Sequence, residues 1–247
     1  MCTREKTIVL FDVDGTLTPS RLPINQEVVE TLVKLKEKVT IGFVGGSDLE
    51  KQKQQLGEMA CGFFDFSFSE NGLTAYKGTE LIGKKSFIQE LGEEKYKKLV
   101  NFTLEYLSRL DLPVKRGTFI ELRDGMINVS PIGRNCAQNE RLDFAKLDSK
   151  EKIRARMVEE YERVFEGFGL QFSIGGQISI DIFPVGWDKR FCLRHLQKHS
   201  FEEIHFFGDK TEKGGNDHEI FNHPSVIGHT VTSPEDTVQQ LKRIFNV

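Results

Sequence analysis

The chain has 247 residues, a formal net charge of −3, and hydrophobic and charged fractions of 38% and 29%, ordinary values for a globular protein with a buried core. Because it has neither a basic surplus nor a basic run, its composition argues against a nucleic-acid partner and against an acidic membrane surface. No stretch approaches the roughly 18 consecutive apolar residues that span a bilayer, so we expect no membrane segment.

Both ends of the chain show the strand pattern of a buried parallel sheet. Continuous apolar runs at 7–11 (TIVLF), 39–44 (VTIGFV) and 204–207 (IHFF) are typical of strands covered on both faces. Helical patterns follow the first two runs, at about 25–38 and 48–57. This alternation predicts an α/β fold with helices packed on a parallel, Rossmann-like sheet.

In the middle of the chain, apolar and polar residues alternate with a period of two. Alternating runs in 119–130 flank Asp124-Gly125, and further alternating runs in 170–182 flank Gly175-Gly176. Turn residues between alternating runs predict two β-hairpins. Each hairpin should have one apolar and one polar face, because successive strand residues point to opposite sides.

Helices at about 88–110 and 149–167 should cover the apolar face of these hairpins and leave the polar face free. We therefore expect residues 83–187 to form an inserted α+β cap domain built on an antiparallel sheet. Residues 1–82 and 188–247 would together form the core domain. The polar face would carry Arg123, Asn128, Ser179 and Asp181.

The strongest chemical signal is DVDGT at 12–16, directly after the first strand. Ligands of open α/β sheets bind outside the carboxyl ends of the strands. A spacing of two places Asp12 and Asp14 on the same side of an extended chain, where the carboxylates push their pKa values apart unless a cation joins them. One group would then attack as a carboxylate and the other carry a proton. The alternative is a turn rich in aspartate.

Ser47 lies in Gly45-Gly46-Ser47-Asp48, after the second apolar run. A hydroxyl beside the free N–H groups of a helix N-terminus suits a phosphate. The alternative is that Ser47 only caps its helix, because Ser47 and Glu50 have the spacing of a capping box. At the other end of this helix, Gly57 could be the C-cap.

Two further segments carry charge near strand ends. Asp209 follows the apolar run at 204–207 and could give Mg²⁺ a hard oxygen ligand beside Asp12, while Asp217 could anchor the loop or reach the waters of the metal. Lys189, in Trp187-Asp188-Lys189, could neutralise charge that develops during phosphoryl transfer. Taken alone, each segment is more typical of an exposed loop.

The four cysteines, Cys2, Cys61, Cys136 and Cys192, match no zinc or redox spacing. We therefore expect free thiols in a reducing compartment, with the cytoplasm as the expected location. The first apolar run is too short for a signal peptide.

Taken in order, these segments resemble the four loops of the haloacid dehalogenase superfamily. The resemblance to the eukaryotic-type phosphomannomutase family is closer and covers nearly the whole chain. It is carried by FDVDGTLTPSR, VGGSD, SENGL, NVSPIGRNC, the Glu140-Arg141 pair, GGQISIDIFPVGWDK and FGDKTEKGGNDHEIF.

The resemblance implies a core domain of the haloacid dehalogenase type and a cap that gives substrate specificity. Asp12 would be the phosphorylated nucleophile and Asp14 the general acid/base, and Mg²⁺ would be held by Asp12, the main-chain carbonyl of Asp14 and Asp209. Ser47 and Lys189 would support the transferring phosphoryl group. The sugar phosphate would be bound by Arg21, Arg123, Arg134, Arg141, Ser179 and Asp181, and Asn128 joins this set through its place on the polar face.

The implied reaction interconverts mannose 6-phosphate and mannose 1-phosphate through an aspartyl-phosphate and a hexose 1,6-bisphosphate, for GDP-mannose synthesis and glycosylation. The resemblance also implies a homodimer joined through the cap. Two alternatives remain open. One is a sugar-phosphate phosphatase of the same superfamily, which needs one phosphate pocket only. The other is a silent sugar-phosphate-binding module, which would be expected to lack Asp12 or Asp14.

Overall fold

The computed structural model describes residues 6–20, 22–60 and 62–247. The chain divides into two compact units. The first, unit 1, contains the residues up to Lys84 together with Gly186–Val247, and the second, unit 2, is Lys85–Val185. Among the described residues, no helix combines the length and apolar character that a membrane crossing requires.

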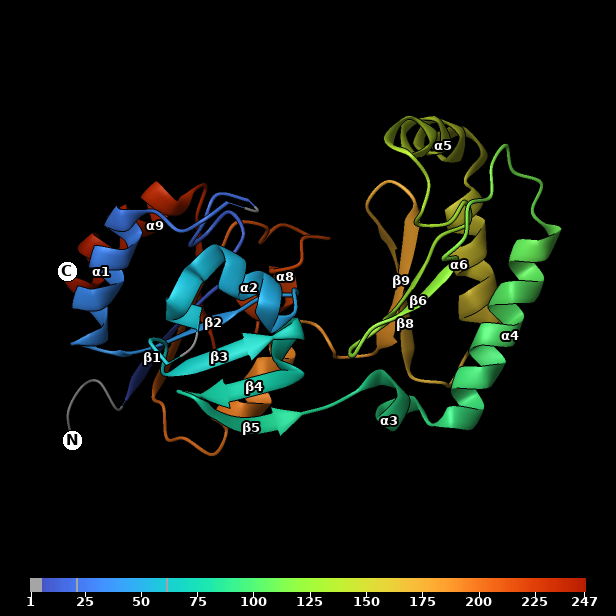
Figure 1. Cartoon of the computed structure of the whole chain (residues 1–247). Helices are drawn as coiled ribbons and strands as arrows, with labels where there is room; N and C mark the ends of the chain where they lie inside the picture. Colours follow the sequence, from blue (N-terminus) through green and yellow to red (C-terminus); the bar gives the residue numbers. More distant parts are fainter. Residues whose placement is uncertain (1–5, 21, 61) are drawn as a thin grey trace. The chain divides into compact units, whose positions relative to one another are not determined.

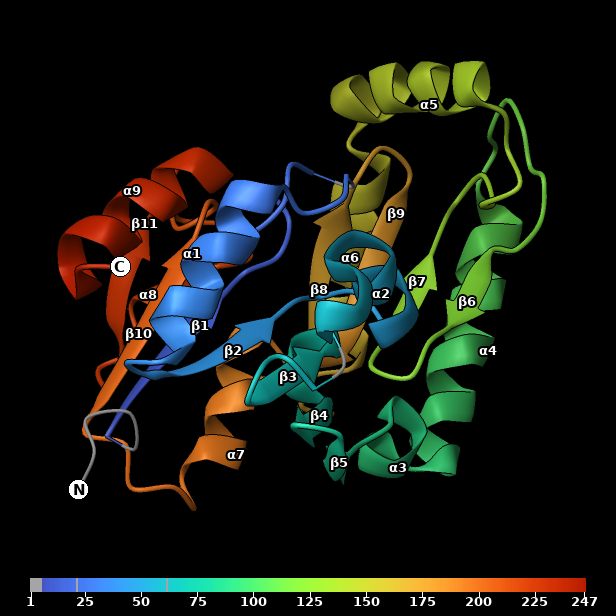
Figure 2. The same cartoon turned by 60° about the vertical axis from the view of Figure 1, so that its left-hand side comes forward.

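Unit 1 is built on a mostly parallel sheet with the strand order β11-β10-β1-β2-β3-β4-β5 (β1 to β5 are labelled in Figure 1, β10 and β11 in Figure 2). All pairs from β11 to β3 are parallel, whereas β3–β4 and β4–β5 are antiparallel. The expected α/β class and the parallel core sheet are confirmed. The strands are β1 (Thr7–Phe11), β2 (Thr40–Val44), β3 (Phe66–Ser69), β4 (Thr74–Lys77), β5 (Glu80–Lys84), β10 (Glu203–Gly208) and β11 (Ile227–Thr230).

Helices cover both faces of this sheet, and β1 supplies alternate residues to two cores. Val9 and Phe11 pack with residues of α1, α2 and α9, while Ile8 and Leu10 pack with residues of α7 and α8. Figure 2 shows α1 and α9 side by side on the first face. Burial on both faces explains why β1 reads as a continuous apolar run. The helices are α1 (Gln26–Lys36), α2 (Leu49–Leu56), α7 (Leu193–Leu196), α8 (His218–Phe221) and α9 (Pro234–Phe245).

Unit 2 is an α+β unit whose antiparallel sheet has the order β6-β7-β9-β8. Both predicted hairpins are confirmed: Leu122 pairs with Ile127 across Asp124-Gly125, and Gly175 pairs with Ser179. The strands are β6 (Ile120–Leu122), β7 (Ile127–Val129), β8 (Leu170–Gly175) and β9 (Ser179–Pro184). The helices are α3 (Phe87–Leu91), α4 (Glu93–Arg109), α5 (Gln138–Glu151) and α6 (Ile153–Val164).

The apolar face of this sheet is covered by α6, as expected. The ring of Tyr161 stacks on that of Phe172 in β8 with centroids 5.1 Å apart. Its hydroxyl shares a 2.7 Å hydrogen bond with Thr103 of α4, so the one polar atom of this buried ring is satisfied. Cys136 and Cys192 are buried free thiols, and Cys2 and Cys61 lie outside the described residues.

Two predicted helices were too long. The pattern at 88–110 is split between α3 and α4 at Gly92, whose φ of 85° and ψ of 144° no helix contains. The pattern at 149–167 spans the end of α5 and all of α6, because Lys152 adopts a left-handed conformation between them. A hydrophobic period continues across one irregular residue, so periodicity alone does not locate such breaks.

Candidate active site

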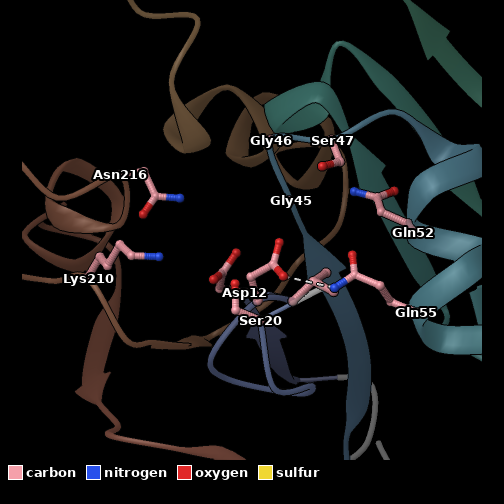
Figure 3. A pocket seen from close by; sticks show the side chains of 11 residues that line it. Asp12, Ser20, Gly45, Gly46, Ser47, Gln52, Gln55, Lys210 and Asn216 are labelled. Atoms are coloured by element: carbon pink, nitrogen blue, oxygen red, sulfur yellow. Dashed lines mark hydrogen bonds between the residues drawn. The ribbon is translucent and has the colours of Figure 1, made fainter. Parts of the chain in front are cut away.

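A cavity of about 290 Å³ lies in unit 1, at the carboxyl ends of β1, β2 and β10 (Figure 3). These strands are neighbours in the sheet, so the loops that follow them converge although they are far apart in sequence. In Figure 3, Lys210 approaches from one side of Asp12 and Gln55 lies on the other. The lining residues are Asp12, Val13, Asp14, Ser20, Gly45, Gly46, Ser47, Gln52, Gln55, Lys210 and Asn216.

Asp12 is the first residue after β1 and is almost fully buried. Its backbone N–H donates a 2.9 Å hydrogen bond to the carbonyl of Phe207, which continues the pairing of β1 with β10. Its carboxylate accepts a hydrogen bond from Lys189. Burial raises the pKa of Asp12 to about 6, although the charge of Lys189 acts to lower it.

Lys189 begins the short 3₁₀ helix Lys189–Cys192 and is 1% exposed. Its ammonium forms ion pairs with Asp12 and Asp217. Burial acts to lower the pKa of Lys189, but the two carboxylates outweigh it, so the pKa is raised and the ammonium stays charged. The sequence placed Lys189 near the site, and the structure places it in contact with Asp12.

Asp12, Asp209 and Asp217 form an acidic cluster in which one oxygen of each residue lies within 4.8 Å of the others. The buried ammonium of Lys189 pairs with Asp12 and Asp217, and the ammonium of Lys210 lies 3.5 Å from Asp209. Two ammonium groups thus face three carboxylates, which leaves an excess of one negative charge. Within the described part of the chain, Oδ1 of Asp209 is buried and accepts no hydrogen bond. An unsatisfied buried carboxylate oxygen beside excess negative charge fits a divalent cation with oxygen ligands.

Asp217 acts as an anchor, one of the two roles that its sequence position allowed. Its Oδ1 accepts from Lys189, and its Oδ2 accepts a 3.0 Å hydrogen bond from the backbone N–H of Lys210. Both oxygens are therefore engaged with the chain itself. Among the clustered carboxylates, this leaves Asp12 and Asp209 as the better candidates for metal ligands.

Gly15 is required beside this cluster. Its φ of 78° is a backbone conformation that favours glycine, and a Cβ at this position would lie 2.4 Å from Oδ2 of Asp209. Any side chain here would displace Asp209. The glycine of the DVDGT segment thus makes room for the acidic residue that follows β10.

Asp14 turns toward helix α2. Its Oδ1 accepts a 2.9 Å hydrogen bond from Nε2 of Gln55. The loop that carries Asp14 closes on itself through a 2.7 Å hydrogen bond from Gly15 N–H to the carbonyl of Thr18. Asp14 and Asp12 therefore face one cavity with different partners.

The prediction that Ser47 caps α2 was wrong. The side chain of Asp48 caps this helix, since it accepts a hydrogen bond from the N–H of Lys51, and α2 begins at Leu49. Ser47 instead lines the cavity, one residue before the cap. Gly57 stands at the C-cap, as expected.

The polar face of the unit 2 sheet carries charged and polar side chains that are joined by hydrogen bonds and ion pairs. Asn128 pairs with Asp181 in the β7–β9 register, and its amide donates to the Asp181 carboxylate. Arg134 donates to the side-chain oxygen of Asn128. Glu121 accepts two hydrogen bonds from Arg123, at 2.8 and 2.6 Å, and its carboxylate lies 3.3 Å from Nε of Arg134.

Arg141 and Ser179 occupy the margins of this set. Arg141 donates to the carbonyls of Arg134 and Cys136, so it supports the loop that carries Arg134. Ser179 is buried at the start of β9, two residues from Asp181 on the same face. Arg21 lies outside the described residues.

Sequence reasoning missed Glu121, Gln55 and Arg154, each of which contacts a predicted site residue. Glu121 shares the face of Arg123 by the period of two, so the alternating pattern contained its signal. Gln55 is a buried polar residue of one helix, and Arg154 is a buried charged residue of another. Helix periodicity assigns such residues to solvent, so no sequence pattern indicates their contacts.

Solved structures with this fold include two of low sequence identity. IMP-bound Plasmodium falciparum IMP-nucleotidase is 17% identical with a TM-score of 0.63, covering 98% of this chain and 68% of that chain. A haloacid dehalogenase-like hydrolase from Bacteroides thetaiotaomicron is 15% identical with a TM-score of 0.63, covering 97% of this chain and all (100%) of that chain. The likeness shows the fold, which is of the haloacid dehalogenase type.

Sequence comparison is more specific. A family model described as eukaryotic phosphomannomutase matches residues 28–247. A phosphomannomutase of Schizosaccharomyces pombe is 60% identical over 245 residues, which cover 98% of this chain and 95% of that protein. A phosphomannomutase of Saccharomyces cerevisiae is 59% identical over 244 residues, which cover 99% of this chain and 96% of that protein. The chain therefore belongs to the eukaryotic phosphomannomutase family, whose members are enzymes of the mutase type.

Proposed function

We propose that this protein is a phosphomannomutase that interconverts mannose 6-phosphate and mannose 1-phosphate through an aspartyl-phosphate and a hexose 1,6-bisphosphate. The observation that carries the proposal is the buried Asp12 carboxylate, held by Lys189 at the edge of a cavity beside two further carboxylates. The similarity to phosphomannomutases over nearly the whole chain supports the choice of substrate.

The first chemical step needs a nucleophile and a proton donor. An oxygen of Asp12 attacks phosphorus, the bond to the sugar oxygen breaks, and Asp14 supplies the proton that this oxygen takes up. In the return step Asp14 accepts the proton of the attacking sugar hydroxyl. Lys189 and Ser47 stabilise the charge on the equatorial oxygens of the phosphoryl group.

Mg²⁺ fits the cluster because the available donors are hard oxygens and the local charge is negative. Asp12, Asp209 and the main-chain carbonyl of Asp14 would hold it. When bound, it supplies electrostatic stabilisation to the phosphoryl oxygens.

The polar face of unit 2 would bind the sugar phosphate. We assign this role to Arg123, Arg134, Arg141, Asn128, Ser179 and Asp181, with Arg21 from unit 1. A bisphosphate that must present either end to Asp12 needs a site that holds each phosphate equally well, and the planar guanidinium suits this task. Unit 1 would thus be the catalytic core domain and unit 2 the specificity cap.

We further propose that the enzyme works in the cytoplasm as a homodimer joined through unit 2. A hexose 1,6-bisphosphate would be its activator, and its product would feed GDP-mannose synthesis and glycosylation. The exposed side chain of Leu104 on α4 supplies apolar surface to such an interface.

One assay tests the proposed reaction. Purified protein is given mannose 1-phosphate, a catalytic amount of hexose 1,6-bisphosphate and Mg²⁺, and both mannose 6-phosphate and free phosphate are measured. We expect mannose 6-phosphate as the main product and loss of activity on removal of Mg²⁺ with a chelator. Mainly free phosphate, even with bisphosphate present, would establish a phosphatase instead.

The covalent step has its own test. Asp12→Asn keeps the shape of the side chain but removes the nucleophilic charge, so it should abolish phosphoenzyme formation and nearly all turnover. Full activity in this variant would rule out Asp12 as the nucleophile. Mass spectrometry of the wild-type protein trapped with substrate should locate the acyl phosphate on residue 12.

A further inference from the structure

Gln55 is a buried polar residue in the last turn of α2, and it contacts the loop that follows β1 at three points. Its Nε2 donates to Oδ1 of Asp14 at 2.9 Å and to the hydroxyl of Thr18 at 3.2 Å. Its main-chain carbonyl accepts a 2.9 Å hydrogen bond from Ile24 N–H. Only 8% of Gln55 is exposed, although it lines the cavity.

The partners fix the orientation of the Gln55 amide. A carboxylate only accepts hydrogen bonds, so the atom facing Asp14 is the NH₂ group and not the oxygen. The hydroxyl of Thr18 donates to the carbonyl of Val13, and it therefore accepts from Gln55. Both amide protons of Gln55 are thus engaged with the loop. In Figure 3, a dashed line marks a hydrogen bond that Gln55 donates.

We propose that Gln55 is a positioning residue for the general acid/base, and that it sets the orientation of the Asp14 carboxyl group by holding its Oδ1. The inference rests on the role proposed above for Asp14. The hydrogen bond from Gln55 to Oδ1 limits rotation of the carboxyl group. As the bond from phosphorus to the sugar oxygen breaks, Asp14 supplies the proton that the sugar oxygen takes up, while Asp12 takes the phosphoryl group.

The proposal predicts a dependence on the leaving group. A sugar oxygen is a poor leaving group and needs the proton as it departs, so its transfer depends on a correctly held acid. A nitrophenolate leaves without a proton, so its transfer depends on Asp12 and the phosphoryl-binding groups only. A residue that merely braced the loop would affect both substrates alike.

The test compares phosphoenzyme formation from mannose 1,6-bisphosphate and from p-nitrophenyl phosphate in single turnovers. Gln55→Met keeps the length of the side chain but removes both donors. Gln54→Met is the matched control, since Gln54 is the adjacent glutamine on α2 and is exposed. The ratio of the two rates is measured in one preparation, so it does not depend on the fraction of folded protein.

We expect Gln55→Met to slow transfer from the bisphosphate about tenfold, less than the 10²–10⁴-fold that general acid catalysis contributes, and to slow transfer from the aryl phosphate by less than about twofold. Gln54→Met should leave both rates unchanged. Equal losses on the two substrates, or no loss on either, would overturn the proposal.

Asp14→Asn separates this inference from the proposed function. If Asp14→Asn shows the selective loss and Gln55→Met does not, Asp14 is the acid and the role of Gln55 is wrong. If Asp14→Asn slows both substrates equally, Asp14 is not the acid, and the proposed mechanism fails together with the inference. If both variants lose transfer from the bisphosphate selectively, the result supports both the acid role of Asp14 and the positioning role of Gln55.

Discussion

Lys189 illustrates how one side chain acquires a role that its sequence position does not reveal. A lysine after a strand is normally solvent-exposed, whereas this one is 1% exposed between Asp12 and Asp217. The burial arises because the loops after β1 and β10 both close around it, and no local pattern encodes that convergence. The position of Lys189 near the chemistry was predictable from the order of the motifs, but its ion pairs were not.

Replacing Lys189 with methionine should therefore cost both stability and activity. Lys189→Met removes the ammonium from two buried carboxylates, and breaking a buried pair in this way typically costs about 3–5 kcal/mol. Urea denaturation measures this loss. Lys210→Met is the control, because Lys210 is half-exposed and its surface ion pair should contribute at most about 1 kcal/mol. A Lys189→Met protein as stable as the wild type would mean that Asp12 and Asp217 are satisfied without it.

Glu121 is a second residue whose charge matters for the proposed ligand. It holds Arg123 and lies beside Arg134, so it competes with any phosphate for these guanidinium groups. Glu121→Gln should tighten binding of mannose 6-phosphate about fivefold, since a partly exposed ion pair contributes up to about 1 kcal/mol. Calorimetry in the Asp12→Asn background, where turnover does not interfere, measures the change.

The control for Glu121 is Glu140→Gln, which alters a similar pair with Arg116 that involves no proposed ligand residue. It should leave the affinity unchanged. Arg134→Ala should weaken binding. Weaker binding in Glu121→Gln would show instead that Glu121 is needed to hold the arginines in place.

At the scale of elements, the sequence predicted the strands that carry the site more accurately than the helices of unit 2. The run at 7–11 coincides with β1, because a strand buried on both faces is apolar throughout. The turn at Asp124-Gly125 joins β6 and β7 as expected. The breaks at Gly92 and Lys152 were missed, since each depends on one backbone conformation rather than on a period.

Arg154 links α6 to the second hairpin of unit 2. Its guanidinium is buried against Asp148 and donates to the carbonyls of Gly175, Gly176 and Ser179. Gly175 and Ser179 pair at the ends of β8 and β9, and Gly176 lies in the turn between them. Arg154 therefore supplies three hydrogen bonds to the closed end of this hairpin, next to Ser179 and Asp181.

Loss of this contact should destabilise unit 2. Arg154→Ala removes the ion-pair partner of the buried Asp148 and three hydrogen bonds to main-chain carbonyls, so we expect a loss of about 3–5 kcal/mol in the free energy of unfolding. Arg156→Ala is the matched control, because Arg156 lies two residues on in α6 and is exposed. Its effect should stay within about 0.5 kcal/mol. Equal stability of the two variants would show that the turn is held by other contacts.

At the scale of the whole molecule, the chain divides into two compact units, and the alternating runs of its middle part lie inside unit 2. Unit 2 is Lys85–Val185, and it has its own sheet, its own buried cluster around Ile132 and Phe144, and the internal Arg154–Asp148 pair. Sequence patterns predict such an insert where alternating runs replace the continuous apolar runs of the core. They do not reveal which exposed helix faces would contact a second copy in the proposed dimer.

Unit 2 should fold by itself and carry the proposed dimer contact. A fragment of residues 85–185 should give a cooperative melt by circular dichroism, because its core and buried ion pair lie within it.

Light scattering should give twice the fragment mass, and twice 28.2 kDa for the full chain. Leu104→Glu, on exposed α4, should convert both to monomers, whereas Leu81→Glu, equally exposed on β5 of unit 1, should not. A full chain that is monomeric at micromolar concentration contradicts the dimer. A dimeric full chain with a folded but monomeric fragment moves the interface to unit 1.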